Sequence, residues 1–211
     1  MHAVPPQLDH LVLAGPALRE AIAFVEERLG SSPLPGGRHP DWGTSNAILP
    51  LGPATYLEVI GPDPEAPTAA RPTIFDIASL AGPRLVTWAA KGSTLAQLTV
   101  RAQSHHIDLG SPRRGSRVRP DGASLTWELT DPFAPRAGGI LPFFIDWQTD
   151  HHPASSAPAQ VKMMSLRARH PDPSSVVAQL GVLNIELEVE YGATPGLVAV
   201  FQAPAGRVTL L

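Results

Sequence analysis

Apolar and polar residues follow short, regular patterns along this chain, and those patterns predict the order of its elements. Residues 8–14 form an apolar run typical of a strand, and the Gly-Pro pair that follows ends it. Apolar residues then recur at helical spacing from Leu18 to Leu29, which predicts a helix that ends at Gly30. After a turn-rich loop with room for one short strand, residues 44–51 and 55–60 have the character of two strands.

The same order of elements recurs twice more along the chain. The second unit is predicted as a strand at 84–90, a helix over 93–104 with Ser93 as its cap, an arginine-rich loop, and strands at 124–130 and 140–147. Residues 148–160 are polar and rich in proline, alanine and serine, which predicts a flexible linker. The third unit is predicted as a strand at 163–170, a helix at 173–181, and strands at 185–191, 196–203 and 207–211.

Three strand–helix–strands units in succession predict an α+β fold, with antiparallel sheets backed by helices on one face. Hydrophobic residues make up 43% of the 211 residues and charged residues 17%, which is enough apolar material for a globular core. A curved sheet built from paired units would leave a concave face for a small-molecule ligand.

Composition and charge exclude several classes of function. Without cysteine the chain has no disulfides, thiolate nucleophiles or iron–sulfur clusters. The net charge of −3, with no long basic run, argues against nucleic-acid and membrane partners, and four arginines between 113 and 119 are more typical of a solvated loop than of an anion site. No signal pattern or membrane-spanning apolar run is visible, so a cytoplasmic location is expected.

Four stretches together resemble the glyoxalase-like domain of the vicinal oxygen chelate superfamily. They are LDHLVLAG, PGGRHPDWGTSNAILPLGPATYLEVIGPDP, SRVRPDGASLTWELT and GGILPFFIDW. The resemblance covers about residues 7–150 and implies a glyoxalase-like domain at 1–150. Its tandem βαβββ modules, at about 7–61 and 84–147, are expected to form a curved, partly open, antiparallel or mixed sheet with helices on its outer face. Residues 161–211 are expected to form an additional βαβββ-like module packed on the same domain.

The candidate chemistry centres on His10 and Glu58. Because side chains alternate along a strand, each residue places one ionisable group on an otherwise apolar strand face, and the two groups face one cavity if their strands are neighbours. The resemblance places divalent-metal ligands at these two positions. A His–Glu pair can also act without a metal, as a general base and its orienting group, or it can line a binding pocket without chemistry.

The second unit departs from the family's metal-binding pattern. Trp88 stands about where a ligand histidine is expected, and Phe144 stands where a carboxylate is expected. His39 and Asp146 are the remaining candidates for a third and a fourth ligand. The pairs His105–His106 and His151–His152 are not interpreted as sites, because adjacent side chains on an extended segment diverge.

Further residues are candidates for contacts with the substrate. They are His39, Trp42, Asn46, Arg117, Arg119, Trp127 and Phe144. The sequence predicts a metal-assisted enzyme of the lyase, isomerase or dioxygenase type that acts on an oxygen-bearing metabolite. The alternative is a non-catalytic protein that sequesters small molecules, and a purely structural module is weaker because polar groups directed into a cavity would serve no purpose. No organic cofactor is expected, and the chain is expected to be a monomer or a homodimer.

Overall fold

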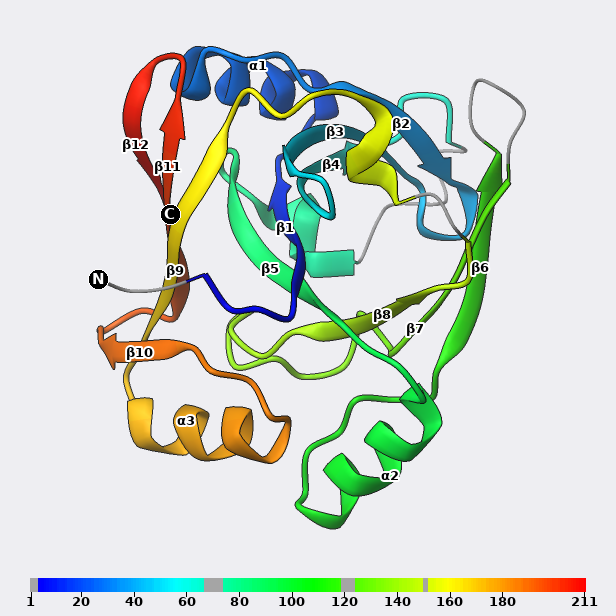
Figure 1. Ribbon diagram of the computed structural model, residues 1–211, viewed down its shortest axis with the longest axis vertical. Coiled ribbons are helices and arrows are strands. Elements are labelled where there is room, and N and C mark those ends of the chain that lie inside the picture. The colour runs from blue at the N-terminus through cyan, green and yellow to red at the C-terminus, as the bar shows by residue number, and fades with distance from the viewer. Residues whose placement is uncertain (1–3, 67–73, 119–123, 150–151) are drawn as a thin grey trace.

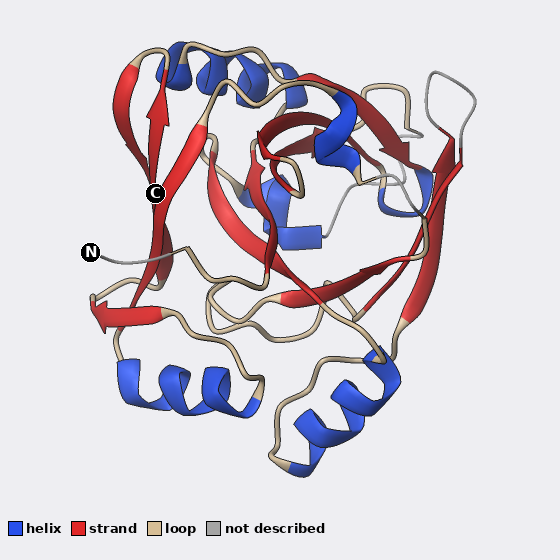
Figure 2. Ribbon diagram, viewed as in Figure 1, coloured by secondary structure: helices blue, strands red, loops and turns tan. Residues whose placement is uncertain are grey.

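The computed structural model describes residues 4–66, 74–118, 124–149 and 152–211 and confirms the predicted α+β class. Within these ranges three α-helices lie around two sheets (Figure 1, Figure 2). The strands are β1 (Leu8–Ala14), β2 (Leu34–His39), β3 (Thr44–Gly52), β4 (Thr55–Pro62), β5 (Arg84–Lys91), β6 (Arg113–Val118), β7 (Ser124–Leu129), β8 (Phe143–Trp147), β9 (Lys162–His170), β10 (Glu188–Tyr191), β11 (Gly196–Ala203) and β12 (Gly206–Leu210). The helices are α1 (Leu18–Leu29), α2 (Leu95–Ser104) and α3 (Pro173–Val182), with 3-10 turns η1 (Pro40–Trp42), η2 (Ile74–Ser79) and η3 (Pro153–Ser156). None of the described helices is long and apolar enough to cross a membrane.

The larger sheet joins two modules side by side. Its strand order is β2-β3-β4-β1-β5-β8-β7-β6, so each module contributes four consecutive strands. Within each module the first strand pairs in parallel with the last, β1 with β4 and β5 with β8, and the antiparallel pair β1–β5 connects the modules. The sheet curls until its two edge strands, β2 and β6, come into contact. The arginine-rich segment predicted as a loop is the edge strand β6, because residues 113–118 pair with β7 along their whole length.

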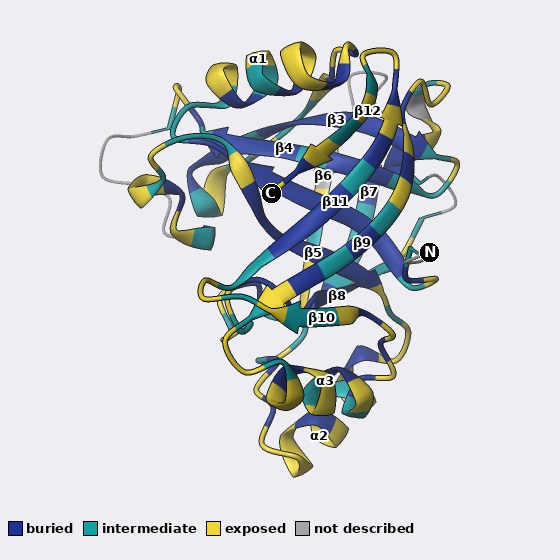
Figure 3. Ribbon diagram, turned by 90° about the vertical axis from the view of Figure 1, so that its left-hand side faces the viewer, coloured by how far each residue is buried: buried dark blue, intermediate teal, exposed yellow. Residues whose placement is uncertain are grey.

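The four-stranded sheet has the order β10-β9-β11-β12 and packs on the outer face of the larger one. It repeats the order of elements of the first two modules but not their pairing, because β9 lies between β10 and β11. Figure 3 shows β9 and β11 crossing over β5. Leu166 and Phe201 share one core with Leu11 and Trp88 of the larger sheet, and the amide of Leu85 donates to the terminal carbonyl of the chain at 2.9 Å.

Strand alternation divides the larger sheet into an outer face and an inner face. On β1 the outer face carries Leu11 and Leu13, which pack in the core that contains α1 and the four-stranded sheet. The inner face carries Val12, Ala14 and His10. Such a division follows from the period of two residues, so a polar group on the inner face of β1 points into the concave side of the sheet.

Two local predictions are wrong. Ser93 does not cap α2: the N-cap residue is Thr94, whose φ of 51° is left-handed and whose hydroxyl donates to the carbonyl of Ser93. The segment predicted as a flexible linker contains η3, where Ala154 is buried against Ile48 and Tyr56. Its apolar residues pack on β3 and β4, which gives the segment a fixed place at the end of the concave face.

Candidate functional site

His10 and Glu58 meet on the inner face of the sheet. Strands β1 and β4 are parallel neighbours, with His10 opposite Tyr56 and Val12 opposite Glu58, so the two polar side chains point the same way. His10 Nε2 lies 3.8 Å from Glu58 Oε2. The imidazole stacks on the ring of Tyr56, with the ring centroids 4.6 Å apart, and meets the ring of Phe143 edge-on at a centroid distance of 5.5 Å. These two contacts hold the plane of the imidazole in place.

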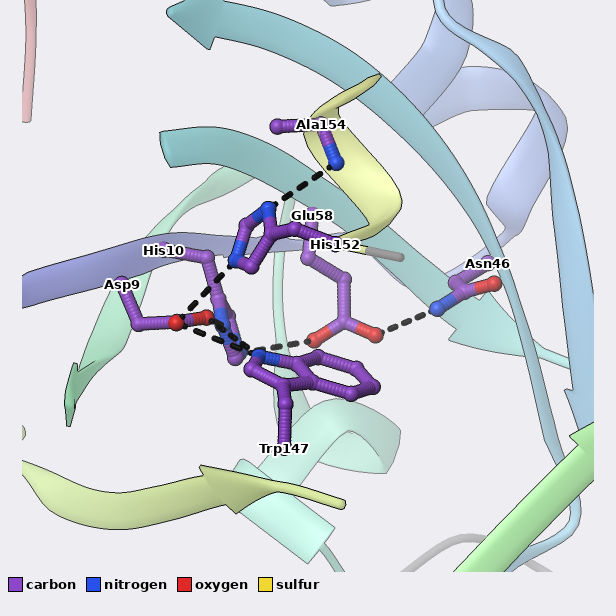
Figure 4. Close-up of polar contacts among 7 residues, drawn as sticks. All are labelled: Asp9, His10, Asn46, Glu58, Trp147, His152 and Ala154. Atoms are coloured by element: carbon purple, nitrogen blue, oxygen red, sulfur yellow. Dashed lines mark hydrogen bonds and ion pairs between the residues drawn. The ribbon is translucent and has the colours of Figure 1, made fainter. Parts of the chain in front are cut away.

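The carboxylate of Asp9 reaches the same site through an irregularity in β1. The pairing of β1 with β5 shifts register between Leu8 and His10, and such a bulge redirects the side chain of the extra residue. Asp9 is fully buried, and its Oδ1 accepts a hydrogen bond from His10 Nδ1 at 2.7 Å (Figure 4). The indole of Trp147 donates to both carboxylate oxygens at 3.2–3.3 Å, and His152 Nε2 donates to Oδ2 at 3.1 Å.

These donors keep Asp9 ionised. Burial alone would raise the pKa of the Asp9 carboxyl, but the hydrogen bonds from His10 and His152, together with the favourable charge of both imidazoles, outweigh it and hold the pKa well below its usual range. The site therefore contains a permanent buried negative charge directly behind His10.

The hydrogen-bond network also assigns the tautomers of both histidines. The amide of Ala154 donates to His152 Nδ1 at 3.1 Å, so the ring proton of neutral His152 is on Nε2, facing Asp9. An ionised carboxylate only accepts, so His10 Nδ1 is protonated as well. Neutral His10 consequently presents the lone pair of Nε2 toward Glu58 and the cavity.

Glu58 is oriented by a second set of contacts. Asn46 Nδ2 donates to Glu58 Oε1 at 2.5 Å, and Asn46 Oδ1 in turn accepts from the amide of Gly37 at 2.7 Å. A Cβ atom at Gly36 would overlap the Asn46 side chain, so glycine at position 36 is needed for this close approach. The remaining carboxylate oxygen, Oε2, is left to face His10.

The cavity in front of these groups is small and mostly aromatic. Its volume is about 50 Å³, which is room for no more than a few water molecules. The lining residues are His10, His39, Trp42, Asn46, Ile48, Tyr56, Glu58, Ile60, Phe75, Trp127, Leu129, Pro132, Phe143, Ile145 and Trp147. A site of this size admits the reacting group of a ligand and leaves the rest of the molecule outside.

The structure brings together six of the eight residues that the sequence indicates for this site and that lie within the described residues. His10, His39, Trp42, Asn46, Glu58 and Trp127 line the cavity. Of the arginines, Arg119 lies outside the described residues, and Arg117 is described only by its backbone in β6. The prediction that places Phe144 in the site is wrong because its side chain packs in the outer core, while Phe143 takes the inner position.

Three residues of this site are not predicted by the sequence pattern, namely Asp9, Trp147 and His152. Alternation places Asp9 on the face opposite His10, and only a bulge brings it back. Trp147 shares its strand face with Phe143, so a correct register of β8 would have included it. The prediction that the pair His151–His152 is no site is wrong for His152, which contacts Asp9 at 3.1 Å. That contact spans 143 residues of sequence, and no periodic pattern in the segment around His152 indicates it.

The residues present do not fit the divalent-metal site that the family resemblance implies. In the second module Ala89 pairs with Phe143 as His10 pairs with Tyr56 in the first, so Ala89 corresponds to His10. By the same register Ile145 corresponds to Glu58, and both residues are apolar. Trp88 faces the outer core, where its Nε1 donates to the carbonyl of Ile140 at 2.7 Å.

The two further ligand candidates do not complete a metal site. His39 Nδ1 is hydrogen-bonded to Thr44 at 3.1 Å, and Asp146 shares the outer face of β8 with Phe144 and does not line the cavity. Among the described residues no group of three or more histidines, aspartates and glutamates is placed to hold a metal ion. Two donors fall short of the three protein ligands typical of catalytic zinc sites, so the chemistry must be sought in the side chains themselves.

Comparisons with known proteins agree with the geometry of the fold. A family model described as a glyoxalase-like domain matches residues 8–183, which is most of the chain. The fold is similar to that of a hypothetical protein from Staphylococcus aureus, with a TM-score of 0.64 and 14% identity over 96% of this chain and 83% of that one. The sequence matches none of the curated proteins with which it was compared.

Two solved methylmalonyl-CoA epimerases are similar at a lower level. The enzyme from Mycobacterium tuberculosis is 21% identical over 69% of this chain and 91% of its own, with a TM-score of 0.42. The enzyme from Streptomyces coelicolor, in complex with 2-nitronate-propionyl-CoA, is 14% identical over 68% of this chain and 98% of its own, with a TM-score of 0.45. Similarities at this level carry no argument about what this chain binds.

Proposed function

The chain belongs to the glyoxalase-like domain family, and from that premise we propose that it is an enzyme that transfers a proton at a carbon next to an oxygen-bearing group of a small molecule. The observation that carries the proposal is the hydrogen bond from His10 Nδ1 to the buried carboxylate of Asp9, which leaves Nε2 as a base that faces the cavity. A general base needs this combination of a fixed tautomer, a stabilising charge behind it and an open path to the substrate.

In the proposed reaction the C–H bond of the substrate breaks and its proton moves to His10 Nε2. The electron pair passes to the neighbouring oxygen as an enolate. The imidazolium formed on His10 is stabilised by Asp9, whose charge is already in place and needs no rearrangement. Glu58 Oε2, 3.8 Å from Nε2, is the group to which that proton can be relayed before it returns to carbon or oxygen.

His152 and Asn46 serve as positioning residues in this proposal. His152 donates to Asp9 and thereby keeps the carboxylate turned toward His10, while Asn46 holds one oxygen of Glu58 and leaves the other facing the base. The two contacts fix the carboxylates of Asp9 and Glu58 in one orientation relative to His10. Fixed orientation of the reacting groups lowers the barrier to proton transfer.

The aromatic lining favours a second candidate, a protein that sequesters apolar or aromatic compounds. Six aromatic rings face a cavity with few polar groups, which is also what a binding pocket provides. This function does not need a base with a fixed tautomer, so the buried Asp9 carboxylate counts against it.

Hydrogen exchange in D₂O separates the two candidates without knowledge of the full reaction. The protein is incubated with a panel of 2-oxo acids, 2-oxo aldehydes and acyl thioesters, and the loss of the C–H signal next to the carbonyl is followed by proton NMR. We expect exchange with at least one compound class, and a loss of about 100-fold or more in the His10→Gln variant.

The matched control is Asp146→Asn, on the outer face of β8, which should leave the exchange rate unchanged. Exchange that persists in His10→Gln would overturn the proposal. If compounds of the panel raise the melting temperature of the protein but none of them exchanges its C–H proton, the proposal is overturned as well, and the sequestering function is favoured.

A further inference from the structure

A larger vestibule lies directly outside the cavity and shares a wall with it. The two spaces have five lining residues in common: His39, Trp42, Trp127, Leu129 and Pro132. The vestibule has a volume of about 310 Å³, several times that of the inner cavity. Its lining residues include Arg38 and His39 of β2 and Arg113–Ser116 of β6, the two edge strands that contact each other. Both strands lie on the right of Figure 1. A ligand whose reacting group reaches His10 can place its remaining atoms here.

One wall of the vestibule carries two arginines of β6. Arg113 lies opposite Leu129 in the β6–β7 pair, and Leu129 lines both spaces, so Arg113 is on the strand face that turns toward the ligand path. Arg114 also borders the vestibule, but as the next residue of an extended strand it lies on the other face of β6, across from Glu128 of β7. Both are exposed, and among the described residues neither has a carboxylate within ion-pair distance.

The other charges around the vestibule are largely compensated. Arg38 on β2 is bound by Asp63 and Glu65, both at 2.6 Å. Asp131 accepts a hydrogen bond from the amide of Phe133 and lies in the field of Arg136, a partly buried guanidinium. Asp41 is the remaining carboxylate of the lining, and it is exposed on the β2 side of the opening. Arg113 is therefore the positive charge that the β6 wall turns toward a ligand, and Arg114 adds to the positive field at the edge of the vestibule.

Aromatic side chains border the passage between the two spaces. Trp127 lies flat against Gly115 of β6, where any Cβ atom would overlap the indole, so the ring is held in a fixed position. The ring of Trp42 packs against the ring of His39 at a centroid distance of 5.4 Å and edge-on against Phe133 at a centroid distance of 6.5 Å. Both indoles line the cavity and the vestibule, and they offer apolar surface to a flat or hydrocarbon segment of a ligand.

We propose that the vestibule is a subsite for the anionic group of an amphiphilic substrate: an apolar or aromatic body passes Trp42 and Trp127, and a carboxylate, sulfonate or phosphate on it binds Arg113, with Arg114 adding to the positive field. The planar guanidinium matches the geometry of such oxyanions. The subsite names the substrate class of the proton-transfer site, and only in that respect does it rest on the proposed function. The binding itself does not need His10.

A pair of fluorescent probes that differ in one charged group tests the subsite. 8-Anilinonaphthalene-1-sulfonate carries an aromatic body and an anion, and N-phenyl-1-naphthylamine carries the same body without the anion. In the double variant Arg113→Gln/Arg114→Gln we expect the dissociation constant of the sulfonate to rise about tenfold, while that of the uncharged probe stays within about twofold. Added salt should weaken the binding of the sulfonate probe and leave that of the uncharged probe unchanged.

Three further variants locate the probes and separate the two proposals. Arg207→Gln removes an exposed arginine of β12 and should change neither probe. Trp127→Ala should weaken both. His10→Gln should leave sulfonate binding intact, so a failure of the proton-transfer proposal would still leave the subsite standing. The subsite is overturned if the double arginine variant binds the sulfonate as tightly as the wild type, if it loses both probes equally, or if Trp127→Ala affects neither.

Discussion

Replacement of Asp9 by asparagine tests the arrangement of the site directly, because it keeps the shape of the side chain and removes its charge. Asp9 accepts hydrogen bonds from His10, His152 and Trp147. Asparagine offers one oxygen and one NH₂ group. His152 cannot reverse its role, because its Nδ1 is occupied by the amide of Ala154. The oxygen of the new amide must therefore face His152 and Trp147, and its NH₂ group must face His10.

Asp9→Asn is thus expected to reverse the tautomer of His10. Nδ1 becomes an acceptor, and the proton moves to Nε2, where it blocks the lone pair that faces the cavity. Proton-transfer activity should fall by about 10²–10⁴-fold, which is the usual contribution of a general base.

The same substitution should lower stability moderately. Three charge-assisted hydrogen bonds become neutral ones at a loss of about 1 kcal/mol each. Relief of the desolvation of a buried charge offsets part of this loss. A net loss of about 2 kcal/mol corresponds to a melting temperature lower by roughly 4–8 °C in a chain of this length.

Long-range ¹H–¹⁵N NMR on histidine-labelled protein reads the tautomer without any substrate. In the wild type the neutral ring of His10 should carry its proton on Nδ1, and in Asp9→Asn on Nε2. Asp146→Asn serves as the control, and its His10 signals should match the wild type. The reasoning is refuted if His10 in the wild type carries its proton on Nε2, or if the tautomer does not change in Asp9→Asn.

Three further predictions concern the supports of the site. Gly36→Ala should displace the amide that orients Glu58 and lower the exchange rate about tenfold or more, whereas Gly52→Ala, where a Cβ meets open space, should not; equal rates in the two variants would contradict this. The depressed pKa of Asp9 should make the wild type lose stability as the pH falls below about 4, because the carboxyl of the unfolded chain takes up its proton first, near its ordinary pKa of 3.8. Urea titrations at several pH values should therefore show the free energy of unfolding falling more steeply with decreasing pH in the wild type than in Asp9→Asn. Equal slopes for the two proteins would count against the buried charge. Trp88→Phe leaves a buried backbone carbonyl without its donor and should lower the free energy of unfolding by roughly 1–3 kcal/mol, with sulfonate-probe binding unchanged since the indole is on the outer face; altered probe binding would show that the two faces are coupled.

Much of the fold was predictable because it depends on local patterns. The helical spacing from Leu18 to Leu29 and the Gly30 stop define α1, whose C-cap is in the left-handed conformation at φ 66°. The alternation in β1 and β4 placed His10 and Glu58 on corresponding faces, and the parallel pairing of the two strands brought them together. Family resemblance added the order of modules, which periodicity alone does not specify.

The failures within the two sheets share a cause, because strand register and strand pairing depend on segments that lie far apart in the sequence. Phe144 was assigned to the cavity because the register of a short apolar strand is ambiguous by one residue, and a shift of one residue exchanges the two faces. The pairing of the C-terminal strands differs from that of the first two modules although the order of elements is the same. Neither the register of β8 nor the pairing of the C-terminal strands can be derived from the local order of apolar and polar residues.

The sequence by itself determined which strand faces are apolar, where the helices end, and that one imidazole and one carboxylate interrupt the apolar faces of two strands. Only the tertiary structure decided that a bulge turns Asp9 toward His10 and that His152 returns from beyond β8 to hold it. The physical reason is that side-chain direction along a strand follows a local period of two residues, whereas a bulge and a contact across 143 residues arise from packing between segments whose meeting no local period encodes.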